Sequence, residues 1–144
     1  MEKALVNFFY QEMQFSFSNR TELKKYLAGL FKAEKKQLQS LNIIFVSDQA
    51  LLEINRNFLQ HDYYTDIITF PISPKGKPIQ AELYISIDRV RDNAVREGVS
   101  FKEELHRVIF HGCLHLAGYG DKSSQQIKKM REREDNYLRL YFNK

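Results

Sequence analysis

Residues 100–121 read Ser-Phe-Lys-Glu-Glu-Leu-His-Arg-Val-Ile-Phe-His-Gly-Cys-Leu-His-Leu-Ala-Gly-Tyr-Gly-Asp, and they predict the central helix of the fold. Ser100 followed by Glu103 is a capping-box pattern that starts a helix. Gly118 can adopt the left-handed conformation that ends a helix and turns the chain back. The apolar residues that this helix carries are Leu105, Val108, Ile109 and Leu114.

Outside this helix, four segments have the composition of β-strands and four have helical patterns or caps. The expected strands are residues 4–10, 41–46, 67–70 (stopped by Pro71) and 81–87. The expected helices are residues 19 to about 36, capped around Asn19; 51–58, capped by Ser47 or Asp48; 88–98; and 123 to about 141. Four strands and about five helices predict an α/β or α+β fold, a small mixed sheet packed with helices. The early strand-helix-strand order favours some parallel pairing.

Composition is that of a soluble globular chain of 144 residues, 43% hydrophobic and 28% charged. No repeat or linker divides it, so residues 1–144 are expected to form one domain. The first residues do not have the pattern of a signal peptide, so none is expected, and no apolar run is long enough to span a bilayer. A single cysteine, Cys113, excludes an internal disulfide and fits a reducing cytoplasm; we interpret it as small core filler. The net charge of +4 suits an RNA partner, although a solvated mixed-charge surface explains it equally well.

A metal site is indicated by His111, His115 and Asp121. Histidines four residues apart lie on one face of a helix, where both imidazoles can reach one ion. Asp121, just past the Gly118 turn, can supply a third ligand. Three protein ligands leave one position open, which is the catalytic arrangement of zinc. The alternative is a buried helix with two hydrogen-bonded core histidines.

The spacing His-x-x-x-His-x-x-Gly-x-x-Asp also resembles the metzincin peptidase signature. In those enzymes a glutamate follows the first histidine and serves as general base. Gly112 stands there in this chain and has no side chain, so a peptidase is disfavoured.

Several blocks in this order resemble the YbeY family of rRNA maturation endoribonucleases. That family has a Leu-Asn pair near a helix end, a Thr-Asp-Val-Leu-Ser-Phe-Pro block, a Gly-Asp-Ile-x-Ile-Ser block and a His-Gly-x-Leu-His-Leu-x-Gly-Tyr-Asp-His block. The matching residues here are Ile54-Asn55, Thr65 to Pro71, Ala81 to Ser86, and His111 to Asp121.

The resemblance implies a zinc-dependent endoribonuclease that binds one zinc per chain. Such a hydrolase acts in ribosome biogenesis on single-stranded RNA, notably near the 3′ end of small-subunit rRNA, and its partner is the small ribosomal subunit. A metal-activated water would hydrolyse the phosphodiester. His111, His115 and Asp121 would act through that water.

The chain departs from the family pattern in two places. Asp121 stands where the third ligand is usually histidine, with Gly120 in place of the usual aspartate. Leu59 occupies the position of an arginine thought to hold the RNA phosphate, and Arg56 is the nearest cation in sequence that could replace it.

No motif in the sequence clearly identifies the general base that would take a proton from the attacking water. Asp66 borders a strand end and is a candidate, although a turn or cap hydrogen bond explains it as well. His61 and His106 are interpreted as surface or structural residues. An RNA-associated binding module with structural zinc and little catalysis remains the alternative function.

Overall fold

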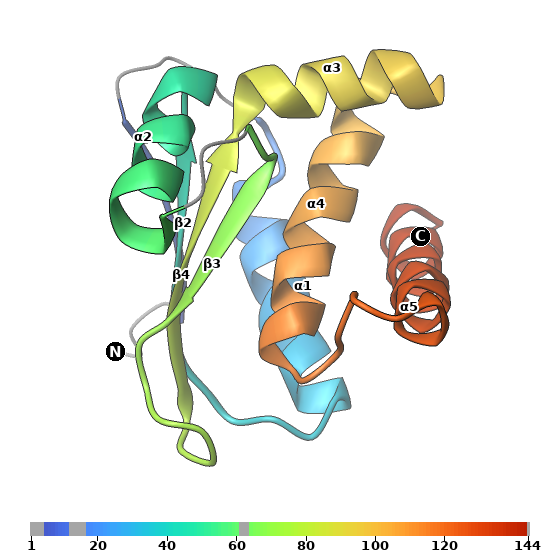
Figure 1. Ribbon diagram of the computed structural model, residues 1–144. Coiled ribbons are helices and arrows are strands. Elements are labelled where there is room, and N and C mark those ends of the chain that lie inside the picture. The colour runs from blue at the N-terminus through green and yellow to red at the C-terminus, as the bar shows by residue number, and fades with distance from the viewer. Residues whose placement is uncertain (1–4, 12–16, 61–63, 144) are drawn as a thin grey trace.

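The computed structural model describes residues 5–11, 17–60 and 64–143, which form a four-stranded mixed sheet and five helices (Figure 1). Strand order is β1-β2-β4-β3, with β1, β2 and β4 parallel and β3 antiparallel to β4. The strands are β1 (Val6–Tyr10), β2 (Leu38–Val46), β3 (Ile67–Pro71) and β4 (Ile79–Ser86). The expected fold class and the early parallel pairing are both confirmed.

The helices follow the predicted segments closely, and serine side chains cap four of them. They are α1 (Arg20–Ala33), α2 (Asp48–Leu59), α3 (Ile87–Glu97), α4 (Phe101–Leu116) and α5 (Ser124–Phe142). The capping serines are Ser47, Ser86, Ser100 and Ser123. No helix in the described ranges is long and apolar enough to cross a membrane.

Three local expectations were wrong. Asn19 precedes α1, but its side chain makes no cap; it donates instead to His106 Nε2 at 2.9 Å and to the hydroxyl of Tyr141. Helix α3 begins at Ile87 rather than Asp88, because Ser86 accepts the hydrogen bond of the Arg89 amide. The sequence of α2 predicts an apolar stripe of Leu51, Leu52, Ile54 and Phe58, but Phe58 is 71% exposed and touches Phe70 edge-on.

The sheet has a helix layer on each face (Figure 1). Helices α1 and α4 cover one face, α5 packs on the outer side of α4, and α2 covers the opposite face. The larger core lies between the sheet and the α1, α4 and α5 layer and includes Cys113, which is fully buried as expected. A smaller core of Val46, Leu51 and Ile68 lies beneath α2.

Gly112 lets α4 approach the sheet closely. A Cβ added at this position would stand 2.7 Å from Ile67 Cδ1 and 2.9 Å from Leu83 Cδ1, closer than atoms pack. Any side chain here must displace residues of β3 and β4. Gly112, which stands where a metzincin peptidase has its glutamate base, therefore also allows α4 to pack closely against the sheet.

Candidate metal centre

His111, His115 and Asp121 line one cavity of about 420 Å³ at the C-terminal half of α4. The start of β3, the two residues before it and the last turns of α2 form its other walls. The residues that complete the lining are Asn55, Leu59, Thr65, Asp66, Ile67, Ile68, Thr69 and Lys122. The structure therefore brings the predicted ligands and Asp66 to one hollow.

The imidazole of His111 is held by a carboxylate from α5. Its Nδ1 lies 2.7 Å from Glu134 Oε2, and this hydrogen bond raises the pKa of His111 above its ordinary value. Glu134 is 4% exposed, and its other oxygen accepts from Arg107 Nη1 at 3.0 Å. With Nδ1 committed to Glu134, Nε2 is the nitrogen left for a metal ion.

His115 is oriented in a similar way by the turn that follows α4. Its Nδ1 donates to the carbonyl oxygen of Tyr119 at 3.1 Å, which again leaves Nε2. Gly118 has φ of +115°, the positive value expected for the residue that turns the chain back after the helix. The Tyr119 amide closes the turn by donating to Leu114 O.

Asp121 is placed by the loop that leads into α5. The amides of Lys122 and Ser123 both donate to Gln126 Oε1, which ties this loop to the first turn of α5. The Gln126 side chain also fills the space beside Gly120, where an added Cβ would meet it at 2.7 Å. Gly120 thus leaves room for the Gln126 side chain, which holds the loop that carries Asp121.

The spacing of two donors fits a zinc ion. His111 Nε2 lies 3.4 Å from Asp121 Oδ2. Two ligands on one tetrahedral zinc, each about 2.0–2.2 Å from the ion, stand roughly 3.4 Å apart. Imidazole nitrogen and carboxylate oxygen are both accepted zinc donors. Within residues 5–11, 17–60 and 64–143, however, no three His, Cys, Asp or Glu side chains already converge as a metal ion requires. His115 lines the cavity but does not stand close enough to His111 and Asp121 to form a three-ligand group with them.

Comparison with known proteins identifies the family. A model of the family described as endoribonuclease YbeY matches residues 7–141. The chain belongs to the YbeY family. Endoribonuclease YbeY of Cytophaga hutchinsonii is 46% identical over 140 residues, which are 97% of this chain and 98% of that relative. Endoribonuclease YbeY of Amoebophilus asiaticus is 40% identical over 96% of this chain and 94% of that relative.

The fold agrees with the same assignment. A Thermotoga maritima protein of known solution structure matches with a TM-score of 0.68 and 28% identity. The match covers 96% of this chain and 89% of that one. The resemblance to the YbeY family seen in the sequence is confirmed, and so is the expected fold.

Asp66, which the YbeY block places before β3, lies at the cavity wall beside His111. Its Oδ2 accepts a hydrogen bond from Asn93 of α3 at 3.1 Å. Burial raises the pKa of Asp66, and the neighbouring His111 charge partly opposes that rise. The carboxyl is thus both anchored and close to the candidate ligands.

The predicted phosphate-binding cation is not at this site. Arg56 is exposed on α2 and is absent from the cavity wall, whereas Leu59, at the YbeY arginine position, lines it. Lys122 supplies a positive charge at the wall instead. Arg56 as an RNA-binding residue stays a prediction.

The remaining histidines lie elsewhere. His106 is buried, so it is structural as expected, with Nδ1 donating to Lys102 O at 2.7 Å. His61 lies outside the described residues.

Sequence reasoning missed Glu134, which reaches His111 of α4 across the fold, and Gln126, which holds the loop just before α5. A weak signal existed for Gln126, since Ser123 and Gln126 have capping-box spacing, and the structure contains that box. Nothing local marks Glu134 among the many charged residues of α5.

Proposed function

We propose that this chain is a zinc-dependent endoribonuclease that acts in the cytoplasm on single-stranded rRNA during small-subunit maturation. Membership of the YbeY family, whose relatives carry the name endoribonuclease, supports the reaction class. The site supports the metal: two imidazoles have Nδ1 committed to fixed acceptors, and a carboxylate stands near one Nε2.

The observation that carries the proposal is the 3.4 Å separation of His111 Nε2 and Asp121 Oδ2. His111 and Asp121 alone could form an ordinary ion pair. The presence of a third possible ligand, His115, in the same cavity favours a metal site instead. His111, His115 and Asp121 would hold the zinc and leave one position open for chemistry.

Each group at the site then has a role in phosphodiester hydrolysis. A zinc ion held here supplies Lewis acidity to a phosphoryl oxygen and to the attacking water. Asp66, anchored by Asn93, is our candidate for accepting the water's proton. Lys122 attracts the phosphate at the cavity wall. Glu134 keeps the His111 ring in the orientation that aims Nε2 at the ion.

One observation favours a second function, an RNA-associated binding module with structural zinc. Leu59 puts an apolar side chain on the cavity wall where YbeY proteins usually carry arginine. The loss of that cation weakens the hold on a phosphate. The peptidase alternative has no support, since Gly112 packs against the sheet and leaves no room for a glutamate side chain.

Metal analysis tests the site first. The purified chain should hold one zinc, and His115→Ala should hold little or none. His106→Gln is the matched control, because His106 lies outside the cavity and should leave the zinc content unchanged. Equal zinc in the wild type and in His115→Ala would contradict the assigned ligands.

Cleavage tests the reaction. Single-stranded fragments from the 3′ end of small-subunit rRNA should be cut by the wild type, and a chelator should stop the cutting until zinc is restored. His115→Ala should be inactive under all conditions. Binding of RNA without chelator-sensitive cleavage would favour the binding module, and cleavage by His115→Ala would indicate a contaminating nuclease.

A further inference from the structure

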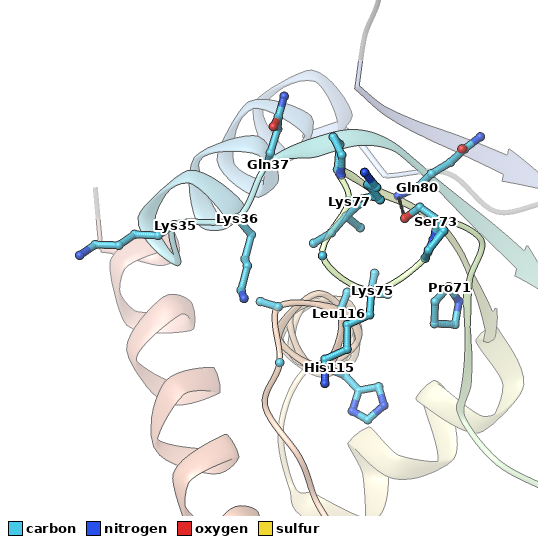
Figure 2. Close-up of a pocket in the computed structure, with 16 residues that line it drawn as sticks. Lys35, Lys36, Gln37, Pro71, Ser73, Lys75, Lys77, Gln80, His115 and Leu116 are labelled. Carbon is cyan, nitrogen blue, oxygen red and sulfur yellow. Dashed lines mark hydrogen bonds between the residues drawn. The ribbon is translucent and has the colours of Figure 1, made fainter.

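A second and larger cavity begins on the other side of His115 and measures about 610 Å³. It lies between the end of α4, the segment after α1 and the β3–β4 loop (Figure 2). His115 lines both this cavity and the one that holds His111 and Asp121, so the two hollows are neighbours. A volume of this size falls in the range of roughly 300–1,000 Å³ typical of ligand sites.

The charge on the wall of this cavity has one sign. Lysines line it and no aspartate or glutamate does. Figure 2 shows Lys36 and Lys75 extending toward the end of α4, near His115, while Lys35 points away. We call Lys36, Lys75 and Lys77 the lysine pocket. In the described part of the chain, none of the three forms an ion pair with a carboxylate.

The nearest acidic residue in sequence, Glu34, is already engaged. Its carboxylate accepts from Arg133 Nη2 at 2.6 Å and from the hydroxyls of Tyr119 and Tyr137. These bonds lower the pKa of Glu34 against the effect of its burial. Because Tyr119 belongs to the turn after α4, the same contacts fix the end of α1 beside the candidate metal centre.

Backbone hydrogen bonds hold the two lysine-bearing walls together. The Ile79 amide donates to Gln37 O at 2.8 Å, which joins β4 to the residue after Lys36. The Lys77 amide donates to Pro74 O at 3.2 Å, and Gly76 has φ of +88°, as in the third position of a type II turn. The lysines are therefore presented on fixed backbone.

We infer that the lysine pocket binds the phosphate backbone of the RNA strand on one side of the cleaved bond. The inference rests on the proposed function, because it makes the strand continue from the metal centre past His115. Lysine recognises phosphate as a point charge, and it is the residue this wall supplies. No phenylalanine, tyrosine or tryptophan lines the cavity, and its one imidazole, His115, is a candidate metal ligand, so the contact is with backbone rather than stacked bases. The lysine pocket offers positive charges in place of the arginine that YbeY proteins usually carry at the position of Leu59.

Salt dependence of RNA binding tests this. Fluorescence anisotropy with the zinc-loaded chain and a labelled single-stranded RNA with phosphorothioate linkages, which resist hydrolysis, gives the affinity at several salt concentrations. In the double variant Lys36→Ala/Lys75→Ala, the negative slope of log affinity against log salt should become shallower by about 1.4, or about 0.7 per phosphate contact. That corresponds to a loss of about 25-fold in affinity at 0.1 M salt relative to 1 M.

The matched control removes the same charge elsewhere. Lys128 and Lys129 are exposed on α5 and outside both cavities, so Lys128→Ala/Lys129→Ala should retain the wild-type slope. Zinc content and melting temperature, measured for both variants, show that the fold is intact. Equal slopes for both double variants would overturn the inference.

The two hypotheses fail separately. Chelator-sensitive cleavage together with an unchanged slope in Lys36→Ala/Lys75→Ala overturns the pocket and leaves the nuclease. A reduced slope without any cleavage supports the pocket and overturns the nuclease.

Discussion

His111 Nδ1 and Glu134 Oε2 lie 2.7 Å apart, although 23 residues separate them along the chain. The contact joins α4 to α5, and Glu134 is almost fully buried when it makes it. Arg107 holds the second oxygen of the same carboxylate at 3.0 Å. The arrangement matches the carboxylate–histidine pairs that orient metal-binding imidazoles in proteins. The candidate metal centre therefore depends on helix packing as well as on the motif.

Replacing Glu134 by glutamine should weaken zinc binding by about 10- to 100-fold, the usual effect of losing such an outer partner. The amide retains the shape of the side chain but not the charge that holds the His111 ring. Competition with a chromophoric chelator measures the affinity. Asp135→Asn is the control, since Asp135 also pairs with Arg107 but is 56% exposed and does not touch His111. Equal zinc affinity in the two variants would refute the role of Glu134.

Asp121 offers a test of the third ligand. Asp121→Ala should lower zinc content well below one per chain, because only two imidazoles would remain. Asp121→His restores the residue usual in the YbeY pattern and should keep one zinc, since imidazole is as good a donor. Metal analysis of both variants decides. If Asp121→Ala retains a full equivalent of zinc, another group completes the site, and Asp66 at the cavity wall would be examined next.

Gly112 and Gly29 give opposite expectations for the same substitution. Gly112→Ala should destabilise the fold by roughly 1–3 kcal/mol, the usual cost of overpacking a core, because the new methyl group meets Ile67 and Leu83. Gly29 is exposed on α1 with nothing within 4 Å of an added Cβ, so Gly29→Ala should stabilise by about 0.5–1 kcal/mol. Urea unfolding of both variants measures the difference. A Gly112→Ala protein as stable as the wild type would mean that α4 can move off the sheet at little cost.

The sequence predicted those parts of the site that depend on local spacing. His111 and His115 share a helix face, and Gly118 turns the chain so that Asp121 returns to it. These relations span only eleven residues, and helical geometry fixes most of them. The strands were also predictable, because each is a short β-prone segment bounded by turn residues.

Relations between distant segments were not predictable from the residues alone. Glu134 reaches His111 only because α5 packs against α4 at one particular rotation. Asn19 looked like a helix cap, but its amide bonds His106, 87 positions away, which no local pattern could show. The lysine pocket is built from two loops separated by more than thirty residues. Side-chain partners of this kind follow from packing, which the periodicity of one segment does not determine.

Buried His106 should make the protein sensitive to acid. Burial lowers the pKa of His106 to about 4, from an ordinary value of about 6.5. In the native state Nδ1 donates to Lys102 O and Nε2 accepts from Asn19, so a second proton would oppose the Asn19 amide. Between these two pKa values the unfolded chain binds the proton and the folded chain does not. The free energy of unfolding should therefore fall as pH falls from about 6.5 to about 4, by roughly 3 kcal/mol in total.

His106→Gln isolates this contribution, because glutamine can hydrogen-bond but does not titrate. Urea unfolding of the chelator-treated wild type and variant, at pH steps from 7.5 to 4, gives the two stability curves. The variant should be the less stable protein at pH 7.5, since it loses ring contacts with Tyr141 and Phe142. The gap should narrow toward pH 4, because carboxylates contribute equally to both proteins and only the wild type must keep an imidazole neutral. Parallel curves over this range would show that His106 is not the acid-sensitive group.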